Sequence, residues 1–93
     1  MDATTRANQL RRRARHLRDL ATAIERLPVM SLDTHAGGDT WRGPRADLCR
    51  STLRTNQHQL HGVADDLRWH AHRFDGQADE LDAIDAARVG LVG

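Results

Sequence analysis

Lysine and tyrosine are absent from this 93-residue chain, which has a single cysteine and three aromatic residues. One cysteine excludes an internal disulfide, and no Cys/His spacing typical of a zinc site is present. The sequence also lacks the run of about 20 apolar residues that a membrane-spanning helix needs. Its N-terminus lacks the apolar core of a secretory signal peptide. We therefore expect a protein that is cytoplasmic as synthesised and that holds no cofactor.

Catalytic and metal-binding patterns are equally sparse. Six histidines are present, and His58 and His61 could share a helix face, but a metal site needs more ligands and a second shell around them. Cys49 lies in an apolar pattern, where a free cysteine usually behaves as a small buried hydrophobic residue. We expect no metal and no enzymatic activity.

Apolar residues between positions 3 and 27 recur at steps of three and four, which predicts an amphipathic helix over 3–27. Pro28 is expected to end this helix. Leu20 and Leu27 widen the stripe. Its other members are Ala3, Ala7, Leu10, Ala14, Leu17, Ala21 and Ile24.

Residues 28–43 contain Pro28, Gly37, Gly38 and Gly43 and predict a loop, whose first half is either an irregular or a helical continuation that packs. Pro44 suits the first position of a helix, and Asp47 complements the dipole of its first turn. We expect this second helix over 44–88, followed by a frayed tail, 89–93. Its predicted stripe comprises Ala46, Cys49, Leu53, Asn56, Leu60, Val63, Leu67, Ala71, Phe74, Ala78, Leu81 and Ile84. Asn56 either fixes pairing from within this stripe or is partly exposed.

Two helices joined by one loop predict an all-α, antiparallel helix-turn-helix hairpin that forms a single domain. With a turn near residues 36–40, Asp65 and Asp66 would face the basic end of the first helix. The expected packing places Leu10, Leu17, Leu20, Ile24 and Leu27 on Leu53, Leu60, Val63, Leu67 and Phe74. A flat two-helix surface cannot shield both stripes, and a core of this size contributes only about 3–5 kcal/mol. We therefore expect a helical partner and a four-helix bundle.

Charge is distributed unevenly although the net charge is only +1. Residues 1–27 hold seven arginines against three acidic residues, and residues 76–93 hold four acidic residues against one arginine. The run from Arg11 to Arg18 raises an alternative hypothesis, a small Arg-rich regulator that binds nucleic acid. The near-neutral total and the lack of an aromatic stacking platform weigh against it. Few bulky apolar anchors are available for binding at a membrane surface.

Trp41, Arg42 and Gly43 form a W-x-G tripeptide between the two predicted helices. Gly43 permits a tight entry into the second helix, and Trp41 offers the kind of large side chain that anchors an interface. In length, position of the tripeptide and flanking helices, the chain resembles the WXG-hundred family, the ESAT-six-like and EspC-like hairpins of type VII secretion.

The resemblance implies a homo- or heterodimeric four-helix bundle and export through a type VII system, as a substrate or as the adaptor of a larger effector. Many exported members carry Tyr-x-x-x-Asp/Glu after the second helix, and this chain has no tyrosine. It would then depend on a partner for that signal, or would not be exported. The partner-binding residues we predict are Leu10, Leu17, Ile24, Trp41, Gly43, Leu53, Leu60, Leu67 and Phe74.

Overall fold

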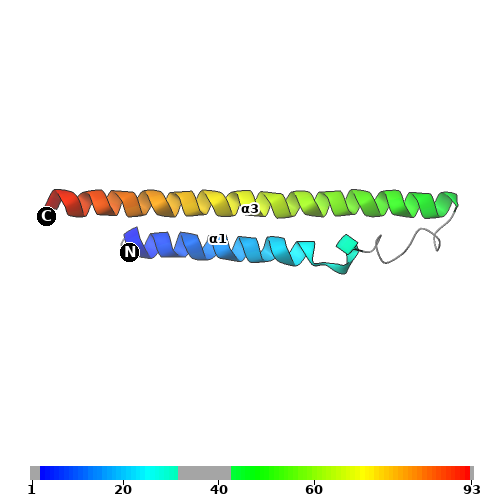
Figure 1. Ribbon diagram of the computed structural model, residues 1–93, viewed down its shortest axis with the longest axis horizontal. Helices are drawn as coiled ribbons and strands as arrows, with labels where there is room; N and C mark the ends of the chain where they lie inside the picture. Colours follow the sequence, from blue (N-terminus) through cyan, green and yellow to red (C-terminus); the bar gives the residue numbers. More distant parts are fainter. Residues whose placement is uncertain (1–2, 32–42, 93) are drawn as a thin grey trace.

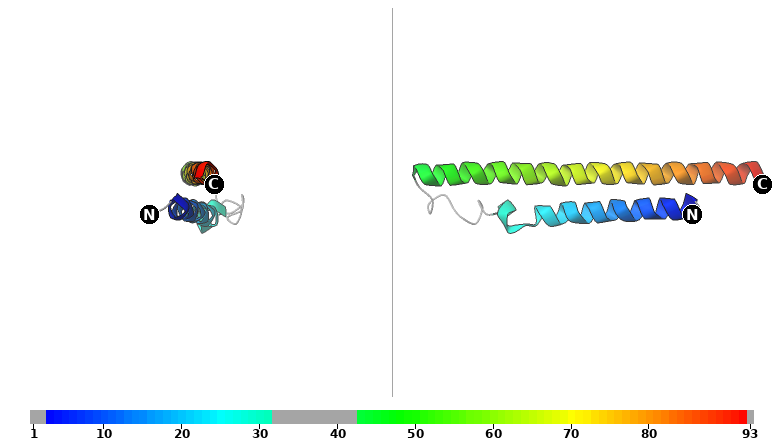
Figure 2. Two further views of the ribbon diagram at one scale, coloured as in Figure 1. Left: turned by 90° about the vertical axis from the view of Figure 1, so that its left-hand side faces the viewer. Right: turned by 180° about the vertical axis from the view of Figure 1, so that it is seen from behind.

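Two antiparallel helices lie side by side and form a rod, as seen in the computed structural model of the chain (Figure 1). The structure describes residues 3–31 and 43–92, which fold as α1 (Ala3–Glu25), the 3-10 helix η1 (Pro28–Ser31) and α3 (Pro44–Val92). The rod measures 74 × 17 × 15 Å, and views from the end and from behind show that it is two helices thick (Figure 2). Its radius of gyration is 21.3 Å, against roughly 12 Å for a compact domain of this length. The predicted all-helical hairpin is confirmed.

The first helix ends two residues earlier than predicted. Residues that precede a proline disfavour the α conformation, so Pro28 also affects Leu27. The last turn is therefore narrower than an α-helix: the N–H of Leu27 bonds to the carbonyl of Ile24, three residues before it, at 3.1 Å. Pro28 then starts η1, the helical one of the two continuations considered for this segment. The side-chain amide of Gln57 donates to the carbonyl of Val29 at 2.8 Å, which holds η1 against α3.

The second helix begins at Pro44 as predicted. Gly43 has φ +95°, a left-handed conformation that glycine adopts without steric cost, and its carbonyl accepts the N–H of Asp47 at 3.0 Å. The predicted frayed tail is wrong, because α3 continues to Val92. It runs without a break through Gly62, Gly76 and Gly90, each of which has open space where a Cβ would lie.

Alanines form the contact between the two helices. The fully buried side chains of the described residues are Ala7, Ala14 and Ala21 of α1 and Ala64, Ala71 and Ala78 of α3. Each set repeats every seven residues, the period of a coiled-coil seam. No described side chain larger than alanine is fully buried. We call this contact the alanine seam.

The alanine seam corrects the predicted leucine core. Leu20 and Leu27 are each 42% exposed and Val63 is 47% exposed, so they do not pack between the helices. The seam on α3 passes through Ala64, one residue after Val63. Val63 and the residues that share its helical phase therefore lie to one side of the contact between the helices. Cys49, Asn56 and Ile84 lie in that phase, at multiples of seven residues from Val63, and all three are exposed.

The predicted register is also wrong. Asp65 and Asp66 are exposed, and the basic end of α1 lies further along α3, where Arg11 contacts Asp79 and Asp82. A turn at 36–40 would place residues 60–70 of α3 opposite Arg6 to Arg15 of the first arm, the part of the chain before the turn. Because η1 continues alongside α3, the first arm is longer than α1, and the helices pair nearer the C-terminus of α3.

Candidate interaction surface

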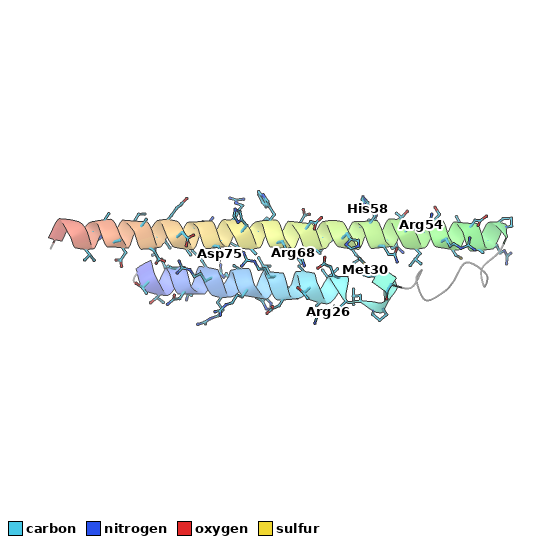
Figure 3. The ribbon with its side chains drawn as sticks, in the orientation of Figure 1. Arg26, Met30, Arg54, His58, Arg68 and Asp75 are labelled. Carbon is cyan, nitrogen blue, oxygen red and sulfur yellow. The ribbon has the colours of Figure 1, made fainter. Side chains whose placement is uncertain are left out.

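Ion pairs line one side of the alanine seam, formed by the residues four positions after each alanine. Arg11 pairs with Asp82 and lies 3.0 Å from Asp79. Arg18 lies 2.6 Å from Asp75, and Glu25 pairs with Arg68. Figure 3 shows Arg68 and Asp75 reaching toward α1, while Arg26 points away from α3. We call this side the charged flank.

The order of charges on the charged flank specifies the register of the hairpin. From its N-terminus α1 presents arginine, arginine and glutamate, and α3 presents aspartate, aspartate and arginine opposite them. A slip of seven residues in one direction would place Arg18 beside Arg68. The opposite slip would place Glu25 beside Asp75. Like charges in direct contact are unfavourable. The observed register pairs opposite charges at all three positions, whereas either slip replaces such a pair with a contact between like charges.

Two of these contacts change the acidity of their groups. The hydrogen bond from Arg68 lowers the pKa of Glu25 below its ordinary value, and the same bond raises the pKa of Arg68. Hydrogen bonds to Asp82 and then Asp79 raise the pKa of Arg11. All of these side chains are partly exposed, so water screens the pairs and each stabilises the fold only modestly.

The opposite side of the seam is apolar. It consists of the apolar residues that share, at multiples of seven residues, the helical phase three positions after or one position before a seam alanine, a spacing that places them together. Its members on α1 are Leu10, Leu17, Leu20, Ile24 and Leu27; those on α3 are Leu53, Leu60, Val63, Leu67, Phe74, Leu81 and Ile84. We call this side the apolar flank. Every one of these side chains is at least partly exposed, and Ile84 is 54% exposed.

Two open grooves indent the apolar flank. The larger, about 400 Å³, is lined by Leu17 and Phe74 with Arg12, Arg13 and His16 beside them. The smaller, about 210 Å³, is lined by Leu10 and Leu81 together with Arg6, Gln9 and Arg13. Each groove therefore has an apolar floor contributed by both helices, and neither has a carboxylate in its lining.

The structure gathers most of the predicted partner-binding residues on this one surface. All seven of the predicted aliphatic and phenylalanine side chains lie on the apolar flank and are partly exposed: Leu10, Leu17, Ile24, Leu53, Leu60, Leu67 and Phe74. Gly43 lies apart from them, at the start of α3. Trp41 lies outside the described residues.

Sequence reasoning missed an aromatic cluster on α3. Trp69 is 56% exposed, the guanidinium of Arg73 stacks over its ring at 5.0 Å, and His70 contacts it edge-on at 5.1 Å. Trp69 is two residues before Ala71, a position that points away from α1. The helical phase of Trp69 relative to the seam alanines is the sequence signal that predicts its position on the outer face of α3.

The arginine run proves to be divided between the two flanks. Arg11 and Arg18 contact carboxylates of α3, whereas Arg6, Arg12 and Arg13 line the apolar grooves. The described residues contain no group of three His, Cys, Asp or Glu side chains placed to hold a metal ion. No described helix combines the length and apolar character needed to cross a membrane.

Comparison of the chain with protein-family models, with curated proteins and with solved structures finds no match.

Proposed function

We propose that this chain is a non-catalytic interaction module that pairs with a second helical protein through its apolar flank. The observation that carries the proposal is the state of the large apolar side chains. Twelve of them line one side of the hairpin, and none is fully buried by the described residues. The accessible surface of 7156 Å² exceeds the roughly 5,400 Å² expected for a compact monomer of this mass.

The energetics favour the same conclusion. Burying one alanine methyl contributes about 0.8 kcal/mol, whereas fully burying a leucine or phenylalanine side chain contributes about 1.5–3 kcal/mol. The alanine seam therefore uses the small contributions, and the part of each large side chain that remains exposed is available for association. Two more helices laid on the apolar flank would complete a four-helix bundle.

Exchange of Phe74 for alanine tests this proposal. Phe74→Ala should weaken the complex with a co-expressed helical partner by roughly tenfold or more, because central aromatic anchors dominate such interfaces. Trp69→Ala is the matched control, since it removes an aromatic side chain of α3 that lies off the apolar flank. The mass of the co-purified complex and its dissociation constant are the readouts. Equal binding by the two variants would refute the proposed surface.

We also propose, in line with the resemblance to the WXG-hundred family, that the module acts as a substrate or adaptor in type VII secretion. The left-handed Gly43 directly before the second helix supports this role for the W-x-G tripeptide. Because the chain has no tyrosine, the Tyr-x-x-x-Asp/Glu signal would come from the partner.

The tryptophan of the tripeptide provides the test. Trp41→Ala should weaken partner binding more than it lowers the melting temperature of the hairpin, since large aromatic side chains are typical anchors of interfaces. Titration calorimetry and thermal melting followed by circular dichroism measure the two effects. A variant that binds as tightly as the wild type would remove Trp41 from the interface.

A further inference from the structure

The arginines around the two grooves differ from those of the charged flank. Arg11 and Arg18 each contact a carboxylate of α3. Arg6, Arg12 and Arg13 are exposed, line the grooves and form no ion pair within the described part of the chain. The grooves thus combine apolar floors with positive charges that the chain itself does not neutralise.

The acidic residues of α1 do not compensate these charges. Glu25 is engaged by Arg68 on the charged flank. Asp19 does not line either groove. The linings of the two grooves therefore contain Arg6, Arg12 and Arg13 and no carboxylate.

We propose that the occupant of the grooves is an amphipathic helix from a different chain, with apolar side chains that fill the grooves and Asp or Glu residues beside them that pair with Arg6, Arg12 and Arg13. This inference rests on the proposed function and specifies the chemistry of the partner. Its basis is charge complementarity: an arginine at the rim of an apolar interface favours a carboxylate opposite and disfavours another cation.

A second copy of the chain does not supply that complement. In a two-fold dimer the apolar flank would face its own image, so α1 would lie over α1 or over α3 of the other copy. The first arrangement brings arginine against arginine. The second brings the arginines against the α3 border of the apolar flank, where Cys49, Asn56, Val63, His70, Gln77 and Ile84 supply no carboxylate. The nearest acidic residues on that side of α3, Asp66 and Glu80, lie further from the seam, two positions after a seam alanine.

Two synthetic helices of about 25 residues, a length that permits helix formation in water, test the proposal with the full chain. Both carry the same leucine stripe, and the residues beside it are glutamate in one and lysine in the other. Fluorescence anisotropy measures their binding. We expect the glutamate peptide to bind roughly tenfold more tightly at low salt, with the difference shrinking as salt screens the charges.

Charge reversal identifies the arginines responsible. Arg13→Glu should shift the preference toward the lysine peptide. Arg54→Glu makes the same change of net charge at an exposed residue on the other side of α3 and should leave the preference unchanged. Circular dichroism of each variant, alone and with peptide, establishes that it remains helical.

The outcomes separate this inference from the proposed function. Equal binding of both peptides, or the same response to the two reversals, overturns the acidic partner and leaves the apolar interface standing. Binding of neither peptide overturns both. A tight homodimer in sedimentation equilibrium that Arg13→Glu does not weaken also overturns the acidic partner.

Discussion

The charged and apolar flanks of the hairpin lie on either side of the same alanine seam, yet only one is complete. On the charged flank, α1 and α3 supply both members of each ion pair. On the apolar flank the two helices supply groups of the same kind, leucines beside leucines, and these remain partly exposed. The contrast teaches that the charges define how the two helices pair with each other, and it underlies our proposal that the apolar residues pair with another protein.

Side-chain size explains why the ion pairs and the large apolar residues lie on opposite sides of the seam. Small side chains allow two helices to approach closely, and large side chains at the same positions would hold them apart. With alanine at the centre, the leucines are displaced to one side, where a single hairpin has no third helix to cover them. The chain thereby gains a defined register at the expense of a buried core.

The largest expected effect comes from disrupting the seam on which both flanks depend. Ala71→Leu inserts a bulky side chain where the helices touch, and overpacking of this kind costs about 1–3 kcal/mol. The melting temperature of the hairpin should fall by several degrees or more. Ala83→Leu makes the same exchange at an exposed position of α3, and it should melt close to the wild type. A seam variant as stable as this control would show that alanine is not required there.

A smaller effect is expected from reversing one pair on the charged flank. Arg18→Asp places a carboxylate beside Asp75 and should destabilise the hairpin by about 1 kcal/mol, near the upper end for exposed pairs. Adding Asp75→Arg restores opposite charges in swapped order and should recover most of the loss. Urea denaturation of both single variants and the double variant measures the coupling. Additive losses in the double variant would mean that the two residues do not interact.

The smallest effect concerns the acidity of Glu25. Its pKa is lower in the folded chain than its ordinary value near 4.5, so it contributes stability above that value, and this contribution is lost as the pH falls through the lowered pKa. The difference in unfolding free energy between the wild type and Glu25→Gln should therefore be constant near neutral pH and shrink below about pH 4.5. Urea denaturation between neutral and acidic pH measures it. A difference that does not change on acidification would contradict the ion pair with Arg68.

Helix existence and the helix starts were predictable because local signals determine them. The steps of three and four, Pro28 and the Gly43–Pro44 pair place the two helices within a few residues of their observed bounds. The phase of the second stripe was not predictable from hydrophobicity alone, since Val63 and Ala64 are both apolar and either continues the pattern. Alanine every seven residues in both helices was the available signal, and it identifies the seam.

The residues of the apolar flank were predicted as a group, but for a reason that differs from their observed arrangement. Leu17 and Phe74 were expected to pack in the core between the helices, and they are partly exposed and line an open groove. The arginine pairing could not be predicted, because it depends on a register set by how far η1 extends beside α3. No local pattern in the sequence specifies that length.

Gly62, Gly76 and Gly90 recur every fourteen residues along α3, each with open space where a Cβ would lie, and Gly62 and Gly76 are each two residues before a seam alanine. Alanine at such sites favours a helix by up to about 1 kcal/mol per substitution. The outward edge of α3 therefore offers three places where the hairpin could be made more heat-resistant without altering either flank. A hardened version of this kind would separate the chain's own folding from its association, because any remaining dependence on a second protein could no longer be attributed to a weak helix.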